Sequence, residues 1–373
     1  MIRRYAISML IVVLSIANQS GCTSATTKPV RLEPPATPEL TPIFSTIHLT
    51  PDNINEMEEL DFLSSTSPDW VAGIAFNVDV QQILTISKTG LLQRWRLEDN
   101  VLLDEMDLGS VGLAAVSFDT QANLVAAGAG RTTLAMQDGY SSDIGGVRVW
   151  DTRTGELLLE TNPGSDTFHF PVNDVALSLD GQWLGIVDSS SYDLWNTSSG
   201  EPVALTAIID SDESEPVSLT TVAIDPSGTW LALGNDTGEV IVKEREQDSS
   251  EHTIWSIGNN EEGSLVALSF DVSRTRLAAV TTQSLIVWDL QSHDTLLKEE
   301  LSFTAVAGLT FSPDSTLVAV GTLNGWQIWS VNDRRLLVEH EQPALAIAFS
   351  PDSRLFAWGD AAGVVHIWGV PDP

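Results

Sequence analysis

A sequence repeat occurs seven times between residues 70 and 368 of this 373-residue chain. In each copy an apolar strand comes first and a second strand rich in Leu, Ala and Gly follows. The third strand then ends in Trp in six copies and in Lys in the fourth. The clearest copies are LVALSFDVSRTRLAAVTTQSLIVWDL (265–290) and VAGLTFSPDSTLVAVGTLNGWQIWSV (306–331). A unit of about 40–45 residues that contains only strands indicates a β-propeller. The positions that end the third strands are Trp95, Trp150, Trp195, Lys243, Trp288, Trp329 and Trp368.

The predicted fold is all-β: a seven-bladed β-propeller of four-stranded antiparallel blades. The first strand of each unit, such as VALSF (266–270), is nearly all apolar, as expected for a strand that is buried on both faces. Ala and Gly in the second strand let neighbouring sheets approach closely. The third strand alternates, and its final Trp buries a large surface between blades. Trp255 and Trp326 fall outside this register and are the better candidates for exposed aromatic residues, although we favour a core position for both.

Each unit also needs a fourth, outer strand after the Trp, and the last unit lacks one. ELLLET (156–161) follows Trp150, but only GVPDP follows Trp368. The segment MEELDFL (57–63) precedes the first blade, where an outer strand precedes the next blade in the other units. We predict that it pairs with VVHIW (364–368) and closes the ring, because an uncovered strand edge favours aggregation.

Several of these residues resemble the WD40 repeat. Trp150-Asp151 and Trp288-Asp289 are similar to its Trp-Asp dipeptide, and FSPDS (311–315 and 349–353) is similar to the turn between its first two strands. The resemblance covers roughly residues 55–370 and implies a seven-bladed propeller. The chain departs from the family because it lacks the Gly-His pair that opens most units, with only His169 near such a position, and because Lys243 replaces one Trp. The departures imply that the buried His–Asp hydrogen bonds of the family are missing from most blades.

The N-terminus, MIRRYAISMLIVVLSIANQSGC, holds the one long apolar run of the chain. Its apolar residues are too few to span a bilayer, since a spanning helix needs about 20. We interpret residues 1–21 as a secretion signal. It ends before Cys22, the only cysteine, and QSGC resembles a bacterial lipoprotein box, except that Gln19 stands where an aliphatic residue is usual. We expect acylation of Cys22, with ordinary cleavage as the alternative, and hence an exported protein anchored on the extracytoplasmic side of a bacterial envelope membrane.

Residues 22–43 contain five prolines and few apolar residues. Proline-rich segments are extended and semi-rigid, so we expect a stalk that holds a globular head away from a surface. The predicted organisation is a signal peptide (1–21), a lipid-anchored linker (22–43) and a WD40-like propeller (44–373).

The chain carries 51 Asp and Glu against 18 Lys and Arg, a formal net charge of −33. This argues against nucleic acid as a partner, because binding to phosphates depends on Lys and Arg. It also argues against electrostatic adhesion to anionic lipid, so the acyl anchor is the expected membrane link. The acidic surface either recruits basic partners or divalent cations, or it keeps the protein soluble and the propeller monomeric. We favour the second interpretation.

Two long insertions interrupt the repeating unit. RTTLAMQDGYSSDIG (131–145) separates the second and third strands of the second blade, and IIDSDESEPVS (208–218) follows the outer strand of the third. In WD40 folds both connections open onto one face, and insertions concentrated on one face are usual for a binding face. An unselected loop expansion is the alternative. The candidate partner-binding residues are Arg131, Met136, Tyr140, Asp210, Asp212 and Glu213.

No strong catalytic motif is present. The sequence has no His-Glu-x-x-His, no Gly-x-Ser-x-Gly and no Walker loop. Its six histidines lie in different units without ligand spacing, and DSDESE (210–215) lacks the glycine and the ordered spacing of a calcium loop. We therefore predict no catalytic residue, no metal and no cofactor.

The sequence favours a non-enzymatic, surface-tethered scaffold that binds an unknown protein. One alternative is a propeller enzyme of the hydrolase or lactonase type, whose axial active site would combine residues of several blades. Another is an extracytoplasmic cation or glycan binder. Three or more His, Asp or Glu side chains at one mouth of the channel would favour the enzyme, and an apolar patch over 131–145 and 208–218 would favour the scaffold.

Overall fold

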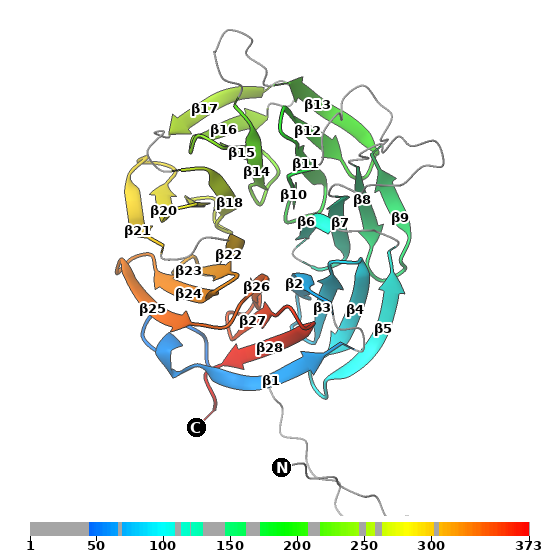
Figure 1. Ribbon diagram of the computed structural model, residues 1–373, viewed down its shortest axis with the longest axis vertical. Coiled ribbons are helices and arrows are strands. Elements are labelled where there is room, and N and C mark those ends of the chain that lie inside the picture. Colours follow the sequence, from blue (N-terminus) through cyan, green and yellow to red (C-terminus); the bar gives the residue numbers. More distant parts are fainter. Residues whose placement is uncertain are drawn as a thin grey trace, which may run out of the picture. The chain divides into compact units, whose positions relative to one another are not determined.

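Seven four-stranded antiparallel sheets make up the described part of the chain, and they are arranged in a ring (Figure 1). The predicted seven-bladed β-propeller is therefore confirmed. Within the described residues the one helical element is the short 3-10 helix η1 (Ile54–Glu56), and no helix there is long and apolar enough to cross a membrane. The computed structural model describes residues 45–65, 69–108, 113–119, 121–129, 146–161, 172–207, 217–245, 251–257, 263–301 and 306–372.

In blades 1 to 6 the strands follow one another in sheet order, from an innermost first strand to an outer fourth strand at the rim (Figure 1). Blade 1 contains β2 (Val71–Phe76), β3 (Gln82–Ser87), β4 (Leu91–Arg96) and β5 (Val101–Asp107); blade 2 contains β6 (Leu113–Phe118), β7 (Leu124–Ala129), β8 (Val147–Asp151) and β9 (Leu157–Glu160); blade 3 contains β10 (Asp174–Leu177), β11 (Trp183–Val187), β12 (Ser191–Asn196) and β13 (Glu201–Ala207). Blade 4 contains β14 (Leu219–Ile224), β15 (Trp230–Asn235), β16 (Val240–Arg245) and β17 (Glu251–Ile257); blade 5 contains β18 (Leu265–Phe270), β19 (Arg276–Thr281), β20 (Ser284–Asp289) and β21 (Thr295–Glu300); blade 6 contains β22 (Val306–Phe311), β23 (Leu317–Thr322), β24 (Gly325–Ser330) and β25 (Arg335–His340).

The seventh blade is completed from the other end of the chain. Its outer strand β1 pairs antiparallel with β28, from Glu58 opposite Gly369 to Ser64 opposite Val364. The predicted pairing of 57–63 with 364–368 is therefore confirmed, and both ends of the described chain belong to one sheet (Figure 1). The strands of this blade are β26 (Ala346–Phe349), β27 (Leu355–Gly359), β28 (Val364–Gly369) and β1 (Glu58–Ser64).

The apolar core consists of seven clusters, and each cluster lies between two consecutive blades. At the junction of blades 7 and 1, Ile83 and Trp95 pack with Leu355 and Ile367, and the closing strand β1 adds Leu63. Propeller sheets bury both faces, so the continuous apolar first strands and the Ala-rich second strands fit this arrangement. No cluster is confined to one blade, which means that the blades stabilise one another.

The tryptophans that end the third strands lie in these junctions, as predicted. Each contacts the cluster shared with the preceding blade, where an indole buries a large apolar area. The buried ones are Trp95, Trp150, Trp288 and Trp329, and the half-buried ones are Trp195 and Trp368.

Lys243 takes the same position in blade 4. Its Nζ donates a hydrogen bond to the hydroxyl of the buried Tyr192 of blade 3 (2.6 Å) and lies 4.7 Å from the centroid of that ring. A hydrogen bond and a cation–π contact thus replace the indole packing of the other junctions. Among the described residues, this junction also has the smallest apolar cluster.

The two tryptophans outside the register are not exposed, which agrees with the core position favoured for them over an exposed one. Trp326 is fully buried, with its ring 5.2 Å from that of His340 and 5.0 Å from that of Phe356. Trp255 is half-buried and lies edge-on to Trp288 at 5.5 Å. Trp326 lies on the face of β24 opposite to Trp329 and packs in the junction with blade 7, and Trp255, on the outer strand β17, packs against the junction of blades 4 and 5.

The same side-chain to backbone hydrogen bond recurs in all seven turns between first and second strands. A polar side chain just after the first strand accepts a hydrogen bond from the backbone N–H five residues further on, at 2.5–3.0 Å. Three residues after this acceptor the backbone is left-handed, with φ between 54° and 69°. The same geometry therefore recurs although the turn sequences differ. The accepting residues are Asn77, Asp119, Ser178, Asp225, Asp271, Ser312 and Ser350.

Removal of β1 tests whether the ring depends on its closing strand. A chain that starts at Ser67 loses the pairing with β28 and the buried side chains of Leu63 and Met57. We expect a loss of at least about 5 kcal/mol in the free energy of unfolding, or insolubility, because these two side chains, the buried Leu49 and Ile54, and a ladder of hydrogen bonds are removed together. A chain that starts at Thr41 is the control and should fold normally. Equal melting temperatures for the two chains would contradict closure by β1.

Candidate functional site

The two faces of the ring carry different connections, because antiparallel strands place alternate connections on opposite faces. The turns from first to second strands and from third to fourth strands lie on one face, which we call the turn face. The connections from second to third strands, and from each outer strand to the next blade, lie on the other, which we call the insertion face. The strands β7 and β13, which precede the predicted insertions in the sequence, both end on the insertion face.

The residues that the sequence analysis singled out lie outside the described residues, so their roles stay predictions. This holds for Cys22, Arg131, Met136, Tyr140, Asp210, Asp212 and Glu213.

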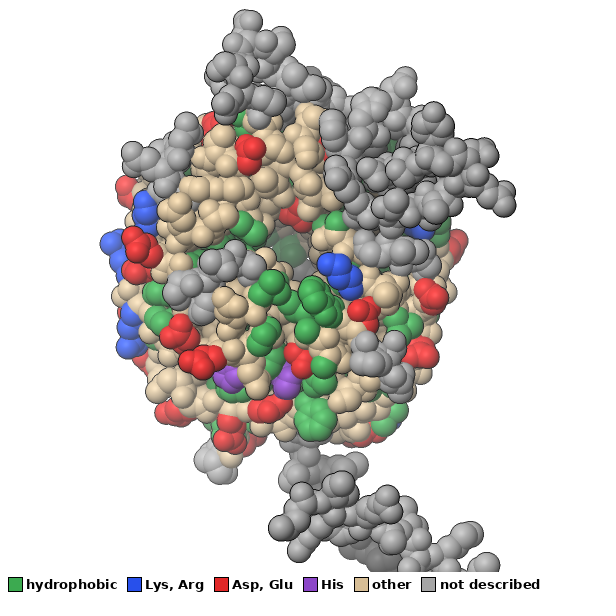
Figure 2. All heavy atoms as spheres, viewed as in Figure 1, with side chains coloured by type: hydrophobic (Ala, Val, Ile, Leu, Met, Phe, Trp, Pro, Cys, Tyr) green, Lys and Arg blue, Asp and Glu red, His purple; other side chains and the backbone are tan. Residues whose placement is uncertain are grey.

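The first strands enclose a central channel that opens on both faces, and Figure 2 shows hydrophobic side chains gathered round the opening. Near the insertion face a cavity of about 610 Å³ is lined by Trp70, Lys88, Asp174 and Leu323, among other residues. Near the turn face a cavity of about 560 Å³ has a mostly apolar lining, in which Asp119 is the one charged residue. The described lining of the channel therefore carries few charged side chains, in contrast to the acidic chain as a whole.

Trp70 and Lys88 stand at the rim of the insertion-face cavity on a rigid base. Trp70 is 45% exposed, and the Lys88 Nζ lies 5.3 Å from the centroid of its ring. Asp69 fixes this corner: it accepts hydrogen bonds from the N–H of Trp70 (2.8 Å) and from the N–H (2.9 Å) and hydroxyl (2.8 Å) of Thr89. Burial works in the opposite direction, but these hydrogen bonds hold the pKa of Asp69 below its usual value. The indole is thus presented in one orientation.

Leu323 lies on blade 6, in the turn between β23 and β24, and lines the same cavity. It is 43% exposed, close to the exposure of Trp70. Large apolar side chains on two blades thus surround this mouth, and both are carried by short connections of the insertion face.

Asp174 lines the cavity but is engaged in joining blades 3 and 4. Its Oδ2 accepts hydrogen bonds from the hydroxyl of Thr221 (2.7 Å) and the N–H of Val222 (3.0 Å), and its Oδ1 accepts one from the N–H of Val175 (2.9 Å). Burial raises the pKa of Asp174 to about 6, against the effect of these donors. Both oxygens are satisfied from within the protein, which makes this carboxyl a poor general base and a good structural link.

The described residues give no support to the axial-enzyme hypothesis. Among them, no group of three or more His, Cys, Asp or Glu side chains is placed to hold a metal ion. The two cavities together show two carboxyl groups, Asp174 and Asp119, one near each face. An axial hydrolase needs several such groups to converge at one mouth.

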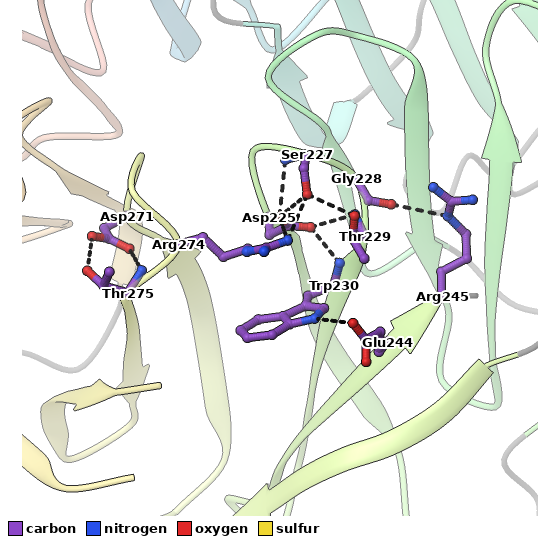
Figure 3. A network of polar contacts seen from close by, with 10 residues as sticks. All are labelled: Asp225, Ser227, Gly228, Thr229, Trp230, Glu244, Arg245, Asp271, Arg274 and Thr275. Atoms are coloured by element: carbon purple, nitrogen blue, oxygen red, sulfur yellow. Dashed lines mark hydrogen bonds and ion pairs between the residues drawn. The ribbon is translucent and has the colours of Figure 1, made fainter. Parts of the chain in front are cut away.

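On the turn face a polar network joins blade 4 to blade 5 (Figure 3). Asp225 is fully buried and accepts hydrogen bonds from the hydroxyl of Ser227 (2.6 Å) and the N–H of Thr229 (2.6 Å). Arg274 reaches across from blade 5: its Nη1 lies 3.4 Å from Asp225 Oδ2 and 3.0 Å from Ser227 Oγ, and its guanidinium lies 4.8 Å from the centroid of the Trp230 ring. The network therefore satisfies a buried charge with a residue of the next blade.

Other arginines bridge blades in similar ways. The guanidinium of Arg245 lies 3.8 Å from the centroid of the Trp183 ring of blade 3, and Arg276 donates to the carbonyl of Ser315 in blade 6. Arg94 of blade 1 donates to the carbonyl of Thr152 in blade 2. Several of the few basic side chains thus hold the ring together, which suits the planar, multidentate guanidinium.

The sequence analysis missed Trp70, Lys88 and Leu323. The available signal was position: Trp70 directly precedes the strand VAGIAF (71–76) and is not at the end of a third strand. A Trp outside a strand has one face free of sheet packing. Lys88 and Leu323 carry no comparable signal, because their exposure depends on where the channel opens.

The fold, the turn motif and the recurring Trp together define a WD40-like seven-bladed propeller. No family model matches the chain. Among curated proteins, Periodic tryptophan protein 2 of Arabidopsis thaliana is similar, at 21% identity over 307 residues, which cover 80% of this chain and 31% of that protein. The chain thus spans about a third of the length of the relative it matches. The name of this distant WD-repeat relative refers to periodic tryptophan, the feature from which the propeller was predicted.

Replacement of Arg274 tests whether the network of Figure 3 stabilises the ring. We expect Arg274→Ala to lower the free energy of unfolding by about 1–2 kcal/mol, because a fully buried carboxylate loses a charged donor. The control is Arg153→Ala, which breaks an ion pair with Asp151 within one turn, where the arginine is 63% exposed. That change should cost close to nothing. Chemical denaturation measures both, and equal effects would show that the bridge is not special.

Proposed function

We propose that the chain is a non-enzymatic scaffold that binds another protein through the insertion face and is tethered to an envelope membrane at Cys22. The observation that carries the binding proposal is the mouth of the channel on this face, where Trp70 and Leu323 are exposed beside a cavity of about 610 Å³. Grouped, exposed apolar side chains on a soluble surface are typical of interaction sites, and Trp is the residue most enriched among interface anchors.

The rigid base of Trp70 supports the same proposal. A side chain that is already held in its bound orientation loses little conformational entropy on binding, so its buried area contributes more fully to affinity. Asp69 and Thr89 supply this preorganisation through hydrogen bonds of 2.8–2.9 Å. A rigid aromatic residue beside a concave mouth suits a partner that places an apolar side chain against the indole.

The net charge of −33 supports a protein partner over a nucleic acid, because the few basic residues cannot neutralise a run of phosphates. The tethering part of the proposal rests on the sequence of residues 1–43. In it, the acyl chains on Cys22 and the proline-rich linker would keep the head close to a membrane surface and raise its effective concentration there.

The binding proposal is tested by affinity capture from a detergent extract of the cell envelope. We expect the wild-type protein to recover a defined partner, and the double variant Trp70→Ala, Leu323→Ala to recover at least about tenfold less, since hot-spot truncations cost about 2 kcal/mol or more. The matched control is Leu158→Ala, an equally exposed Leu (45%) on the outer strand β9. All variants should melt near the wild-type temperature. Equal recovery by both variants would place the binding surface elsewhere.

The tethering proposal is tested separately with Cys22→Ser. We expect the variant to move from the membrane fraction to the soluble fraction, because a propeller of this charge has no other means of staying on an anionic bilayer. Mass spectrometry of the wild-type protein should show acyl chains on Cys22. A wild-type protein that is soluble and unmodified would refute the lipoprotein hypothesis and would leave the scaffold hypothesis standing.

A further inference from the structure

One position of the third strand, two residues before the terminal Trp, carries a repeated polar pair. In four blades the side chain at this position bonds to a glutamate of the outer strand, at 2.6–3.3 Å. In blades 4 and 5 the position holds Ile241 and Ile286. In these six blades the position therefore holds either a polar side chain that is hydrogen-bonded to a glutamate or an aliphatic side chain. The pairs are Gln93–Glu105, Arg148–Glu160, Gln327–Glu339 and His366–Glu59.

Blade 3 breaks this rule, because the position holds Asp193. The residue opposite it in the register of the outer strand is Leu205, which offers no polar side chain. Asp193 is 1% exposed. A buried carboxylate without a cationic partner is costly, because its lost hydration is not replaced by an opposite charge.

A second buried carboxyl group stands beside it. Asp188 is 0% exposed and follows β11, and its Oδ1 accepts hydrogen bonds from the N–H groups of Ser190 and Ser191, both at 2.7 Å. Its Oδ2 has no hydrogen-bond partner within the described part of the chain. The same holds for Oδ2 of Asp193 and for Oγ of Ser191, which is 8% exposed.

These three unsatisfied groups face the same side of the sheet. Asp193 pairs with Ile186 in the register, and Asp188 lies two residues after Ile186. Ser191 lies two residues before Asp193, so strand alternation puts its side chain on that side as well. Ile186 packs in the junction with blade 2, so this face of the blade 3 sheet is the one that faces blade 2. Burial raises the pKa of Asp193 to about 7, and the charge of Asp188 acts in the same direction, while the Trp195 side chain acts against both.

We propose that Asp188, Ser191 and Asp193 form a buried cation site at the junction of blades 2 and 3, and that its ligand is Ca²⁺. Two carboxylate oxygens and a hydroxyl are hard oxygen ligands, which Ca²⁺ accepts in flexible geometry together with backbone carbonyls and water. Mg²⁺ suits the site less, because it demands near-ideal octahedral geometry and gives up its own water reluctantly. Among the described residues, no Lys or Arg forms an ion pair with either carboxyl group.

The site lies directly behind the wall of the insertion-face cavity. Ser189, between the two carboxyl-bearing elements, accepts a hydrogen bond from Nδ2 of Asn173 (3.3 Å), and Asn173 lines the cavity. The N–H of Asn173 also donates to the carbonyl of Val187 (2.9 Å). A bound cation would therefore fix the turn that holds this part of the mouth, so the site reaches the binding face without being part of it.

The first experiment is calorimetric titration of the EDTA-treated, full-length protein with CaCl₂, together with its melting temperature. We expect saturable binding of one tight equivalent, a rise in melting temperature, and an affinity at least about tenfold lower for Mg²⁺. Asp188→Asn and Asp193→Asn should each lower the Ca²⁺ affinity at least about tenfold. The control for the acidic surface is Glu98→Gln, at an exposed position, which should bind like the wild type.

Asp193→Ile keeps the proposal testable if the Asn variants fail to fold. It places in blade 3 the residue type of blades 4 and 5, and it removes one of two repelling buried charges. We expect this variant to melt higher than the wild type in EDTA and to lose the shift with Ca²⁺. A wild-type protein that shows no Ca²⁺-dependent change, or equal binding by the wild type and all carboxyl variants, would overturn the site. The absence of any Ca²⁺-dependent change would indicate that Asp188 and Asp193 share a proton in place of a cation. Equal binding by all variants would indicate that Ca²⁺ binds to the acidic surface.

Discussion

Each blade of the ring buries its two faces against its two neighbours, and no blade has a core of its own. The seven apolar clusters all lie at junctions, including the one that joins the last blade to the first. A four-stranded sheet that stands alone cannot cover both faces, so the stability of every blade depends on the ring being complete. The strand β1 is therefore a condition for the whole fold, because it supplies the outer edge of blade 7 and a side chain to the junction that follows it.

The recurrence of one turn geometry explains how different sequences build equivalent blades. The accepting side chain can be Asn, Asp or Ser, because each can reach the backbone N–H five residues further on. The left-handed residue can be Gly, Ser or even Arg274, whose side chain then leaves the turn and meets the neighbouring blade. The same few residues thus adopt the left-handed conformation that the turn requires and make contacts between blades.

The fold was predictable because its signals are local and repeated. Strand pattern and Trp spacing give the blades, and counting the strands shows that the last blade needs one from the N-terminal side. Exposed and core positions both stayed open for Trp326, because a pattern along one strand does not show that the next blade covers its other face; the structure buries it. The segments proposed for partner binding lie outside the described residues, so they remain untested.

The features of the mouth and of blade 3 could not be predicted for a different reason. Whether Trp70 is exposed depends on where seven first strands leave a channel, which is a property of the closed ring. Asp188 and Asp193 are two of 51 acidic residues, and nothing in their neighbourhood along the chain distinguishes them from surface acids. Their burial becomes visible only when the third strand of blade 3 is compared with its counterparts in the other blades.

The substitution of Lys243 for a junction Trp has a consequence for how the ring comes apart. A closed ring must separate at one junction between blades before any blade can unfold. We expect it to separate at the junction with the least stable contacts. The contact of Lys243 with Tyr192 is polar, and the cluster around it is the smallest in the described part of the chain. The junction between blades 3 and 4 would thus set the rate at which the propeller unfolds. Amide hydrogens there would exchange with solvent sooner than those at the terminal closure, although the closure is where the two ends of the chain meet.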